Sequence, residues 1–490
     1  MSNPRSHAIA AGHRVTAEAG AAILDDGGTA MDAALAAALT AMAVEPVLAG
    51  LLGGGFAMIR PPEGRAQALD FFVDTPLKRQ PGGDLDFRAV YADFGTATQE
   101  FHIGAGAIAT PGVAPGLAEA HARYGRMPLK ALAEPAITAA REGVVITAYQ
   151  ARLAEIVAPI LTASPEARAL HMADGTLKGA GAMLSNPALA DVLEVFGHDG
   201  ARFIQEGEVA AALLEQTASG GHLRRADLIG YAPRWRTPLG CTRQGARLAL
   251  NPEPAIGGAL IAHALEHLPR RPLPHTIAQA LAATDKARRR ARLEAPGGVG
   301  RLLGAPATRG TTHISVVDAT GLGVALTLSN GEGCGLIVPG TGIMANNMLG
   351  EPDLMPDGLD SWAEGTRMAS MMAPTVVDWP DGRAGVLGSG GSSRIASALT
   401  QVLLGLIDGA ASPETAITAP RLHAETDALD YEETGLGEGA RAALLRAFPE
   451  ARGWPEPSMY FGGVHAVLRE AKGGLAAFAD PRRDGWAVVG

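Results

Sequence analysis

Apolar residues near the start of the chain follow two different periods. Over residues 16–24 and 30–44, alanine and leucine recur at every third or fourth position, which predicts two helices. Residues 51–59 and 66–72 are instead short apolar runs, which predict two strands. The Pro- and Gly-containing segment 61–64 lies between these runs, so we expect the two strands to pair as a hairpin.

The remainder of the chain divides into a helical middle and a strand-rich end. Five segments of the middle have helical spacing: 115–124, 128–142, 148–157, 206–218 and 276–292. Beyond residue 310 the pattern predicts two hairpins, a helix and two terminal strands: 312–318 with 323–328, 374–379 with 385–389, 394–407, and 464–479. Residues 295–310 are rich in Gly, Pro and Ala without a clear period, which indicates an exposed, mobile connector.

Composition narrows the class of protein. The chain has 490 residues, and its 47% hydrophobic content excludes a disordered chain. Its 63 glycines exceed the usual share, but they follow no Gly-X-Y period, which excludes collagen. Aromatic residues make up only 4%, so the core must consist mostly of Ala, Leu, Val and Ile. At roughly 100–200 residues per domain, the length allows several domains or one large α/β body.

Charge and cysteine content exclude several kinds of partner. The net charge is −10 and no basic run is longer than Arg288-Arg289-Arg290, so we expect no nucleic-acid partner. Cys241 and Cys334 predict neither a zinc knuckle nor a disulfide framework. Every long uncharged stretch is broken by Gly or Pro, so we expect no membrane span. The first residues contain no apolar signal-like region, which predicts a cytoplasmic protein, or a periplasmic one if a leader is missing.

The segment at 310–318, GTTHISVVD, is the most informative for chemistry. A Gly-containing connector runs directly into a predicted strand, and Thr311 stands at the junction. A Thr hydroxyl becomes an effective nucleophile when a base lies beside it, and one solution uses the free α-amine of the same residue. That solution requires cutting the peptide bond between Gly310 and Thr311. The alternative is that Thr311 only starts a strand, as Thr often does.

A Gly-rich turn at 388–394, GSGGSSR, connects a predicted strand to a predicted helix. Free backbone N–H groups at the start of a helix can hold an anion or an oxyanion. The turn equally suits a tight connection in which a Ser caps the helix. It is not a phosphate-binding P-loop, because no G-x-x-x-x-G-K-[ST] pattern occurs.

Other polar motifs have weaker chemical interpretations. Residues 263–267, HALEH, have the H-x-x-E-H spacing of one class of zinc peptidase, but a structural helix explains them more simply. Asn346-Asn347 and Ser329-Asn330 lie at predicted loop edges, where short polar side chains suit substrate binding or turns. Residues 480–485, DPRRDG, predict a solvated terminal turn.

Taken together, the motifs and their order along the chain resemble those of the γ-glutamyltransferase (γ-glutamyl transpeptidase, glutathione hydrolase) family of N-terminal nucleophile hydrolases. The resemblance covers nearly the whole length. It rests on the segments GGTAMDAALAAALTAMAVEP, GLLGGGFAMIR, TPGVAPGLAEAHARYGRMPLKALAEPAITAAREG, TTHISVVD, PGTGIMANNML, SMMAPTVV, GSGGSSRIASALTQVLLGLID and APRLH. It implies an α+β fold of the αββα type, in which two stacked, mainly antiparallel sheets are flanked by helices.

The resemblance also implies a precursor that cuts itself before Thr311. Residues 1–310 would form a large fragment and 311–490 a small one, and the two would associate as one structural domain. Thr311 would be the nucleophile and, after cleavage, would supply its α-amine as the base. The residues implied in self-cleavage are Gly310, Thr311 and Ser329.

The remaining positions implied by the resemblance hold the oxyanion and the substrate. The backbone of Gly390, Gly391 and Ser392 would form the oxyanion hole. The substrate-binding positions would be Phe72, Ser329, Asn330, Asn347, Glu351, Ser370 and Met371. The resemblance implies no metal and no organic cofactor, and it implies a small-molecule amide or γ-glutamyl-type substrate.

Three of these positions depart from the pattern of the family. Members that bind glutamate carry an arginine where this chain has Phe72, and no arginine follows until Arg79. The paired serines before Met become Ser370-Met371, so one hydroxyl is missing, and the acidic pair after the Asn-Asn segment becomes Gly350-Glu351. Losing the charged partner of a buried carboxylate typically costs several kcal/mol. We therefore expect poor turnover of glutathione.

The sequence thus predicts a self-processing amidohydrolase or acyltransferase with an altered acyl group. One alternative is a homologue that stays uncut and acts as a binding or structural protein. Another is a hydrolase of a small non-glutamyl amide. A metal-dependent peptidase rests only on the 263–267 motif.

Overall fold

The computed structural model describes residues 7–81, 84–93, 98–291, 311–351, 358–359, 361–409, 411–425 and 428–490. Gly310 and the predicted connector at 295–310 lie outside these residues. No helix in the described part is long and apolar enough to cross a membrane.

The first of two large sheets has seven antiparallel strands within the described residues, in the spatial order β10-β3-β2-β14-β13-β1-β22. β13 lies near its centre, where Thr312 pairs with Leu328 of β14 and Ile314 pairs with Ala11 of β1. The strands are β1 (Ala8–Ala11), β2 (Gly54–Arg60), β3 (Gln67–Phe71), β10 (Arg234–Arg236), β13 (Thr312–Val317), β14 (Gly323–Ser329) and β22 (Trp486–Val489).

The second sheet has six antiparallel strands in the described part, in the order β11-β12-β15-β16-β20-β21. They are β11 (Leu239–Arg243), β12 (Ala246–Leu250), β15 (Thr375–Asp378), β16 (Ala384–Gly390), β20 (Gly463–Arg469) and β21 (Leu475–Ala479). The buried residues between the sheets are mostly small: Ala8, Ala10, Met58, Ala68, Val317, Ala325, Val376, Val386 and Val467. The low aromatic content of the chain therefore suits two closely stacked sheets.

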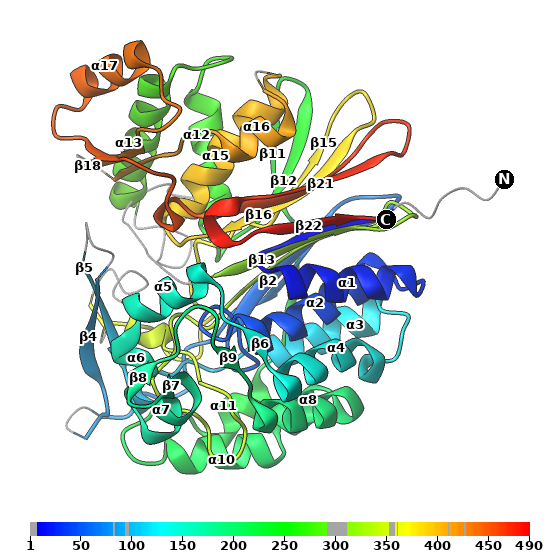
Figure 1. The fold of residues 1–490 in the computed structure, drawn as a ribbon, viewed down its shortest axis with the longest axis vertical. Helices are drawn as coiled ribbons and strands as arrows, with labels where there is room; N and C mark the ends of the chain where they lie inside the picture. The colour runs from blue at the N-terminus through cyan, green and yellow to red at the C-terminus, as the bar shows by residue number, and fades with distance from the viewer. Residues whose placement is uncertain are drawn as a thin grey trace.

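Helices cover the outer faces of both sheets, so the layers run helix, sheet, sheet, helix (Figure 1). Against the first sheet lie α1 (Arg14–Asp25), α2 (Ala30–Val44) and α3 (Val113–Tyr124), while α4 (Leu129–Glu142) packs on α2 and α8 (Pro187–Asp199) packs on α4. Against the second lie α12 (Gly257–His267), α15 (Arg394–Ile407) and α16 (Pro413–Thr418), and α13 (Pro274–Ala291) packs on α12. This architecture confirms the predicted αββα sandwich.

Smaller elements complete the described part. The helical ones are α5 (Ala148–Ile156), α6 (Ala158–Leu161), α7 (Pro165–His171), α9 (Ala201–Gln205), α10 (Glu208–Gln216), α11 (Arg225–Gly230), α17 (Glu438–Ala447) and the 3₁₀ turns at Ala105–Ala107, Met348–Gly350, Met459–Phe461 and Pro481–Arg483. The strands are β4 (Arg88–Asp93), β5 (Thr98–Ile103), β6 (Val144–Val145), β7 (Met172–Ala173), β8 (Thr176–Leu177), β9 (Met183–Leu184), β17 (Leu422–Glu425), β18 (Ala428–Glu432) and β19 (Arg452–Trp454).

Helix α2 shows how the sequence builds the inner layer. Every one of its residues is buried, and its composition is almost entirely Ala, Leu, Met and Val. Thr29 caps its start, because its side chain accepts from Asp32 N while the Asp32 carboxylate accepts from Thr29 N, which forms a capping box. Glu45 follows its last turn and Pro46 prevents continuation.

Both sheets contain strands from before and after residue 311, and in the first sheet the two sets are interleaved. In the first sheet β13 and β14 lie between β2 and β1, and β22 pairs with β1 at the edge. In the second sheet β12 pairs with β15. Residues 7–291 and 311–490 therefore share one hydrogen-bonded framework.

Candidate active site

Thr311 lies at the start of β13, on the face of the first sheet that is turned toward the second. Val317 packs between the sheets, and the alternation of side chains along a strand places Thr311 on the same face. Thr311 is 2% exposed, and its Oγ1 atom is buried without a hydrogen-bond partner among the described residues. Ser329 follows Leu328, the partner of Thr312, so the antiparallel register places Ser329 beside Thr311.

The Gly-rich turn at the end of β16 comes close to Thr311. A Cβ atom added at Gly390 would lie 2.1 Å from the Thr311 carbonyl oxygen, so only glycine permits this approach. Gly391 has a φ of 115°, and Ser392 has a φ of 67°, which is uncommon for a residue other than glycine. Ser393 occupies the N-cap of α15, as the simpler interpretation of this turn expects, but its side chain makes no capping hydrogen bond.

Four of the predicted substrate-binding residues meet around Gly331. Gly331 N donates to Ser329 Oγ at 3.0 Å, and Asn330 follows Ser329 directly. A Cβ atom added at Gly331 would lie 2.1 Å from Asn347 Oδ1 and 2.7 Å from Glu351 Oε1. Glu351 is 1% exposed. The structure thus gathers these polar side chains in one loop region next to the end of β14.

Phe72 belongs to an apolar cluster beside this loop region. It is fully buried and stacks on Phe56, with ring centroids 5.5 Å apart. Tyr231 Oη donates to the Phe72 carbonyl at 2.5 Å, which fixes the backbone. The other buried members of this Phe72 cluster are Val73, Ala109, Ala255, Met348, Leu349, Trp362, Met368 and Met372. The environment of this position is therefore built for an apolar side chain.

Arg367 lies near Phe72 in the chain fold, but its side chain already binds two acidic residues of this protein. Arg367 donates to the Asp70 carboxylate at 2.6 Å, to the Asp74 carboxylate at 2.5 Å, and to the Ala232 carbonyl at 3.0 Å. Burial lowers the pKa of Arg367, but the neighbouring Tyr231, Asp70 and Asp74 outweigh it and raise the pKa overall. Sequence reasoning missed this pair of acids held by one arginine.

Ser370 and Met371 border the Phe72 cluster from the side of the second sheet. Ser370 O accepts from Ile256 N at 2.7 Å, and Ser370 Oγ accepts from Met372 N at 3.3 Å. Met372 is itself a member of the cluster, whereas Met371 packs in the core under the second sheet. Arg288 Nη1 approaches Met371 Sδ at 3.6 Å.

The terminal turn at 480–485 is solvated only in part, because two of its four charged residues are buried. Asp480 is fully buried and Arg482 is 8% exposed. Arg482 binds Glu432 at 2.5 Å and Asp480 at 3.0 Å, and Asp480 also pairs with Arg421 at 3.4 Å. Buried charges of opposite sign compensate one another here, which the letters DPRRDG alone do not reveal.

Glu45 is a further residue beside the site that sequence reasoning missed. It is 4% exposed, and its carboxylate accepts hydrogen bonds from Thr312 Oγ1 at 2.9 Å and Thr16 Oγ1 at 3.0 Å. Burial raises the pKa of Glu45 to about 7, although the two Thr hydroxyls act in the opposite direction. The available signal was one acid directly after an almost entirely apolar helix.

The HALEH motif forms part of α12, as a structural helix requires. His263 Nδ1 shares a hydrogen bond of 2.8 Å with Thr284 Oγ1, and His267 Nδ1 shares one of 2.8 Å with the His263 carbonyl. Among the described residues no group of three or more His, Cys, Asp or Glu side chains is arranged to hold a metal ion.

Comparison with known proteins places this geometry among related enzymes. The model of a family described as Gamma-glutamyltranspeptidase matches residues 16–292 and 278–490. The chain is 30% identical to acylase ACY 1 proenzyme of Pseudomonas sp. (strain V22), over 98% of this chain and 93% of that protein. It is 29% identical to a glutathione hydrolase proenzyme of Pseudomonas aeruginosa, over 98% and 94%.

The fold is also found in a solved structure. The crystal structure of cephalosporin acylase from Bacillus halodurans superposes with a TM-score of 0.83 and covers 100% of this chain and 98% of that one. The two sequences are 23% identical, so this likeness concerns the fold.

Proposed function

The chain belongs to the γ-glutamyltranspeptidase family, and from that premise we propose that Thr311 is the nucleophile of a self-processing amidohydrolase whose acyl group is not γ-glutamyl. The family membership supports an amidohydrolase or acyltransferase of the N-terminal nucleophile type. The observation that carries the finer proposal is the buried Thr311 hydroxyl, unpartnered among the described residues, against the glycine turn at Gly390.

In the proposed self-cleavage, Thr311 Oγ attacks the carbonyl carbon of the preceding residue. The C–N bond breaks, the hydroxyl proton passes to the departing nitrogen, and an ester joins residue 310 to Thr311 Oγ. Water then hydrolyses the ester. This step leaves a carboxylate on residue 310 and a free α-amine on Thr311, while the Thr hydroxyl recovers a proton.

In the proposed catalytic cycle, the new α-amine takes the Thr311 hydroxyl proton as Oγ attacks the substrate amide. The backbone around Gly390, Gly391 and Ser392 would donate hydrogen bonds to the developing oxyanion. The amine proton passes to the leaving nitrogen as the C–N bond breaks, which leaves an acyl ester on Thr311. Water resolves this ester to a carboxylic acid, and an amine acceptor resolves it to a new amide.

The acyl specificity is proposed from the Phe72 cluster. A phenyl ring cannot form an ion pair with an α-carboxylate, and Arg367 gives its donors to Asp70, Asp74 and the Ala232 carbonyl. Burying an unpaired carboxylate among apolar side chains is strongly unfavourable. We therefore propose that the enzyme prefers acyl groups without an α-carboxylate at this position.

A denaturing gel of the purified protein tests the nucleophile. We expect two bands, corresponding to 310 and 180 residues, from the wild type and a single full-length band from Thr311→Ala. A wild-type chain that stays at 490 residues would contradict self-processing and favour an uncut binding or structural homologue.

Hydrolysis of two anilides tests the acyl group. The processed enzyme should release aniline from a simple aliphatic acyl anilide at least about tenfold faster than from the γ-glutamyl anilide, because one missing charged contact is worth more than 1.4 kcal/mol. A strong preference for the γ-glutamyl compound would overturn the role proposed for Phe72. Gain of γ-glutamyl activity in Phe72→Arg would support that role.

A further inference from the structure

Arg483 is a charged side chain beside Thr311 that has no part in the proposed reaction. It ends the 3₁₀ turn Pro481–Arg483, and two residues separate it from β22. A Cβ atom added at Gly390 would lie 2.1 Å from the Thr311 carbonyl oxygen and 3.1 Å from Arg483 Nη1. The guanidinium group and the peptide of Thr311 therefore flank the same glycine.

Two further contacts hold Arg483 in this place. Its Nε and Nη2 atoms both donate to the Met459 carbonyl, at 3.2 and 3.1 Å. Its aliphatic stem lies against Gly463, where an added Cβ atom would come within 3.0–3.1 Å of the Arg483 Cβ, Cγ and Cδ atoms. A Cβ atom at Gly391 would lie 3.3 Å from Nη2. Three glycines thus make room for one arginine next to the start of β13.

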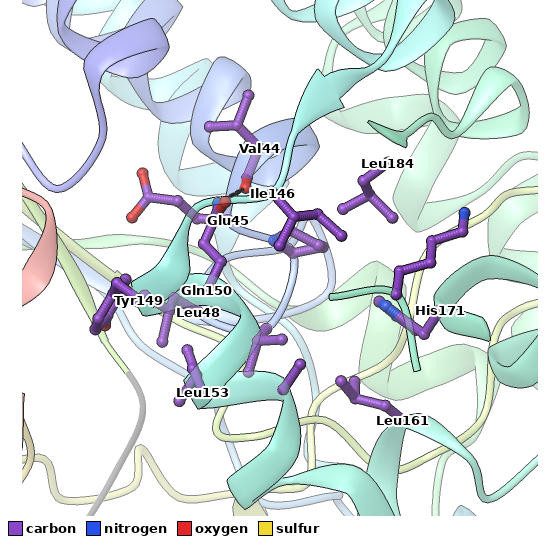
Figure 2. Close-up of a pocket in the computed structure, with 14 residues that line it drawn as sticks. Val44, Glu45, Leu48, Ile146, Tyr149, Gln150, Leu153, Leu161, His171 and Leu184 are labelled. Carbon is purple, nitrogen blue, oxygen red and sulfur yellow. Dashed lines mark hydrogen bonds between the residues drawn. The ribbon is translucent and has the colours of Figure 1, made fainter. Parts of the chain in front are cut away.

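Glu45 lies on the other face of the same strand. Thr312, the residue after Thr311, donates its hydroxyl proton to Glu45 Oε2, and a Cβ atom added at Gly12 would lie 2.9 Å from both of these oxygens. Figure 2 shows the Glu45 carboxyl group turned away from Leu161, His171 and Leu184, which line an apolar cavity of about 40 Å³ on its other side. The carboxyl group thus faces the strand that carries Thr311.

Tyr149 on α5 senses both charges. Burial raises the pKa of Tyr149, Glu45 and Asp484 act in the same direction, and Arg483 opposes them. Burial also lowers the pKa of His465 on β20 to about 4, and Arg483 acts in the same direction. His313, on β13 itself, has its pKa lowered by burial and by His465. Asp484 faces His13 from the same turn as Arg483.

We propose that Arg483 and Glu45 are positioning residues with opposite electrostatic effects, which together set how readily the α-amine of Thr311 holds a proton. This inference rests on the proposed function, because the amine exists only after cleavage. A nearby cation disfavours an ammonium group and so keeps the amine available as a base, whereas a nearby carboxylate favours the ammonium form. The two residues act through the amine and do not contact the reacting atoms.

The pH dependence of kcat/KM for a simple acyl anilide tests the inference on processed enzyme. Arg483→Met should move the acid limb upward by about one pH unit, which is about a tenfold loss of kcat/KM below the limb. Arg483→Lys keeps the charge and should stay within about 0.3 pH unit of the wild type. Glu45→Gln should move the acid limb downward, by an amount that scales with the ionised fraction of Glu45 at the pH of the limb, since burial raises the pKa of Glu45 to about 7. In the Glu45→Gln background, Arg483→Met should still move it upward.

Arg383→Met is the matched control, because Arg383 pairs with Asp381 in the exposed turn between β15 and β16 and should leave the limb unmoved. Limbs that do not move, or that move in the same direction for Arg483→Met and Glu45→Gln, would overturn the inference while leaving the processed wild type and its activity intact. A wild type that is never cut overturns the proposed function instead. Should Arg483→Met fail to cut itself, Glu45→Gln decides alone, since a downward shift supports the pair and an unmoved limb contradicts it.

Discussion

The two halves of the candidate site are built in different ways. Around Thr311, the decisive features are backbone features: Gly390 leaves no room for a Cβ atom, which would lie 2.1 Å from the Thr311 carbonyl oxygen, and Ser392 adopts a left-handed conformation. Around Phe72, the decisive features are side chains: a stack on Phe56 and a surrounding cluster of apolar residues. The region around Thr311 thus depends on the missing side chain of Gly390. The region around Phe72 depends on the apolar side chains that fill it.

This difference separates reaction from specificity. A backbone arrangement that holds an oxyanion is indifferent to the acyl group, because it contacts only the carbonyl that every amide possesses. A side-chain pocket can change its preference through one substitution, since a hydrogen-bonding site and an apolar site reject each other's ligands. We therefore expect substitutions near Thr311 to affect the turnover of all substrates. Substitutions near Phe72 should affect the stability of the fold and the preference for the acyl group.

The largest expected effect is at the nucleophile. Thr311→Ala should lower turnover of any acyl anilide by at least about 1000-fold and leave the chain uncut, because no other oxygen replaces Oγ. Thr311→Ser keeps a hydroxyl and should still yield two bands on a gel. Thr320→Ala, in the exposed turn after β13, removes a similar side chain and should behave as the wild type. An active Thr311→Ala enzyme would show that the Thr311 region does not carry the reaction.

A methyl group in the glycine turn should have the next largest effect. Gly390→Ala would place Cβ at 2.1 Å from the Thr311 carbonyl oxygen, so the turn and the strand must separate. We expect turnover of both anilides to fall by at least about 100-fold and by the same factor, since one lost oxyanion donor alone costs this much. Gly439→Ala on the exposed face of α17 is the control, because a Cβ atom added there meets nothing within 4 Å and the residue does not have a positive φ. A larger loss of turnover for one anilide than for the other would show that the glycine turn also contributes to acyl-group specificity.

Truncation of Phe72 should mainly cost stability. Phe72→Ala removes a fully buried ring from its stack, and we expect the free energy of unfolding to fall by about 3–5 kcal/mol in urea denaturation. Measuring it in the Thr311→Ala background keeps a single chain. Phe478→Ala, which alters a half-buried ring on β21, should cost less. Equal losses for both would contradict the view that Phe72 is central to its cluster.

The smallest effect concerns Glu45, on the other face of β13 from Thr311, and depends on pH. Because burial raises the pKa of Glu45 from 4.5 in the unfolded chain to about 7, the folded state binds the proton more tightly. Its contribution to stability is therefore present below pH 4.5 and is lost as the pH rises through 7. Relative to wild type, Glu45→Gln should gain up to about 3 kcal/mol between these limits, measured as unfolding free energies in the Thr311→Ala background. A pH-independent difference would contradict the raised pKa.

Much of the fold could be predicted because its pattern is local. The helix at 394–407 has the predicted bounds, and the hairpins of β2 with β3 and β13 with β14 follow from apolar runs separated by turn residues. The short strands β10, β11 and β12 were not predicted in a middle region expected to be mostly helical. β10 pairs with β3 and β12 pairs with β15, which are partners far along the chain that local periodicity does not report, and β11 is added through a short hairpin with β12.

The candidate site divides in the same way. Thr311 and the glycine turn were identifiable from residue types at a strand start and a helix start. Glu45 and Arg483 were not, because their importance arises from burial beside β13 and from distant partners such as Thr16 and Met459. The terminal turn is the clearest case. Four of its six residues are charged, which suggests an exposed turn until the buried ion-pair partners are known.

The interleaved strands have a consequence for how such a protein can be made. A chain cut before Thr311 would leave β13 hydrogen-bonded on one side to β1 of the other fragment and β14 hydrogen-bonded to β2. Separating the fragments would then require breaking the centre of a sheet, so dissociation and global unfolding become a single event. The uncut chain refolds as a first-order process, whereas the cut protein must refold as a second-order one that slows on dilution. Cleavage would thus make unfolding hard to reverse, so the lifetime of the mature enzyme would depend on its rate of unfolding.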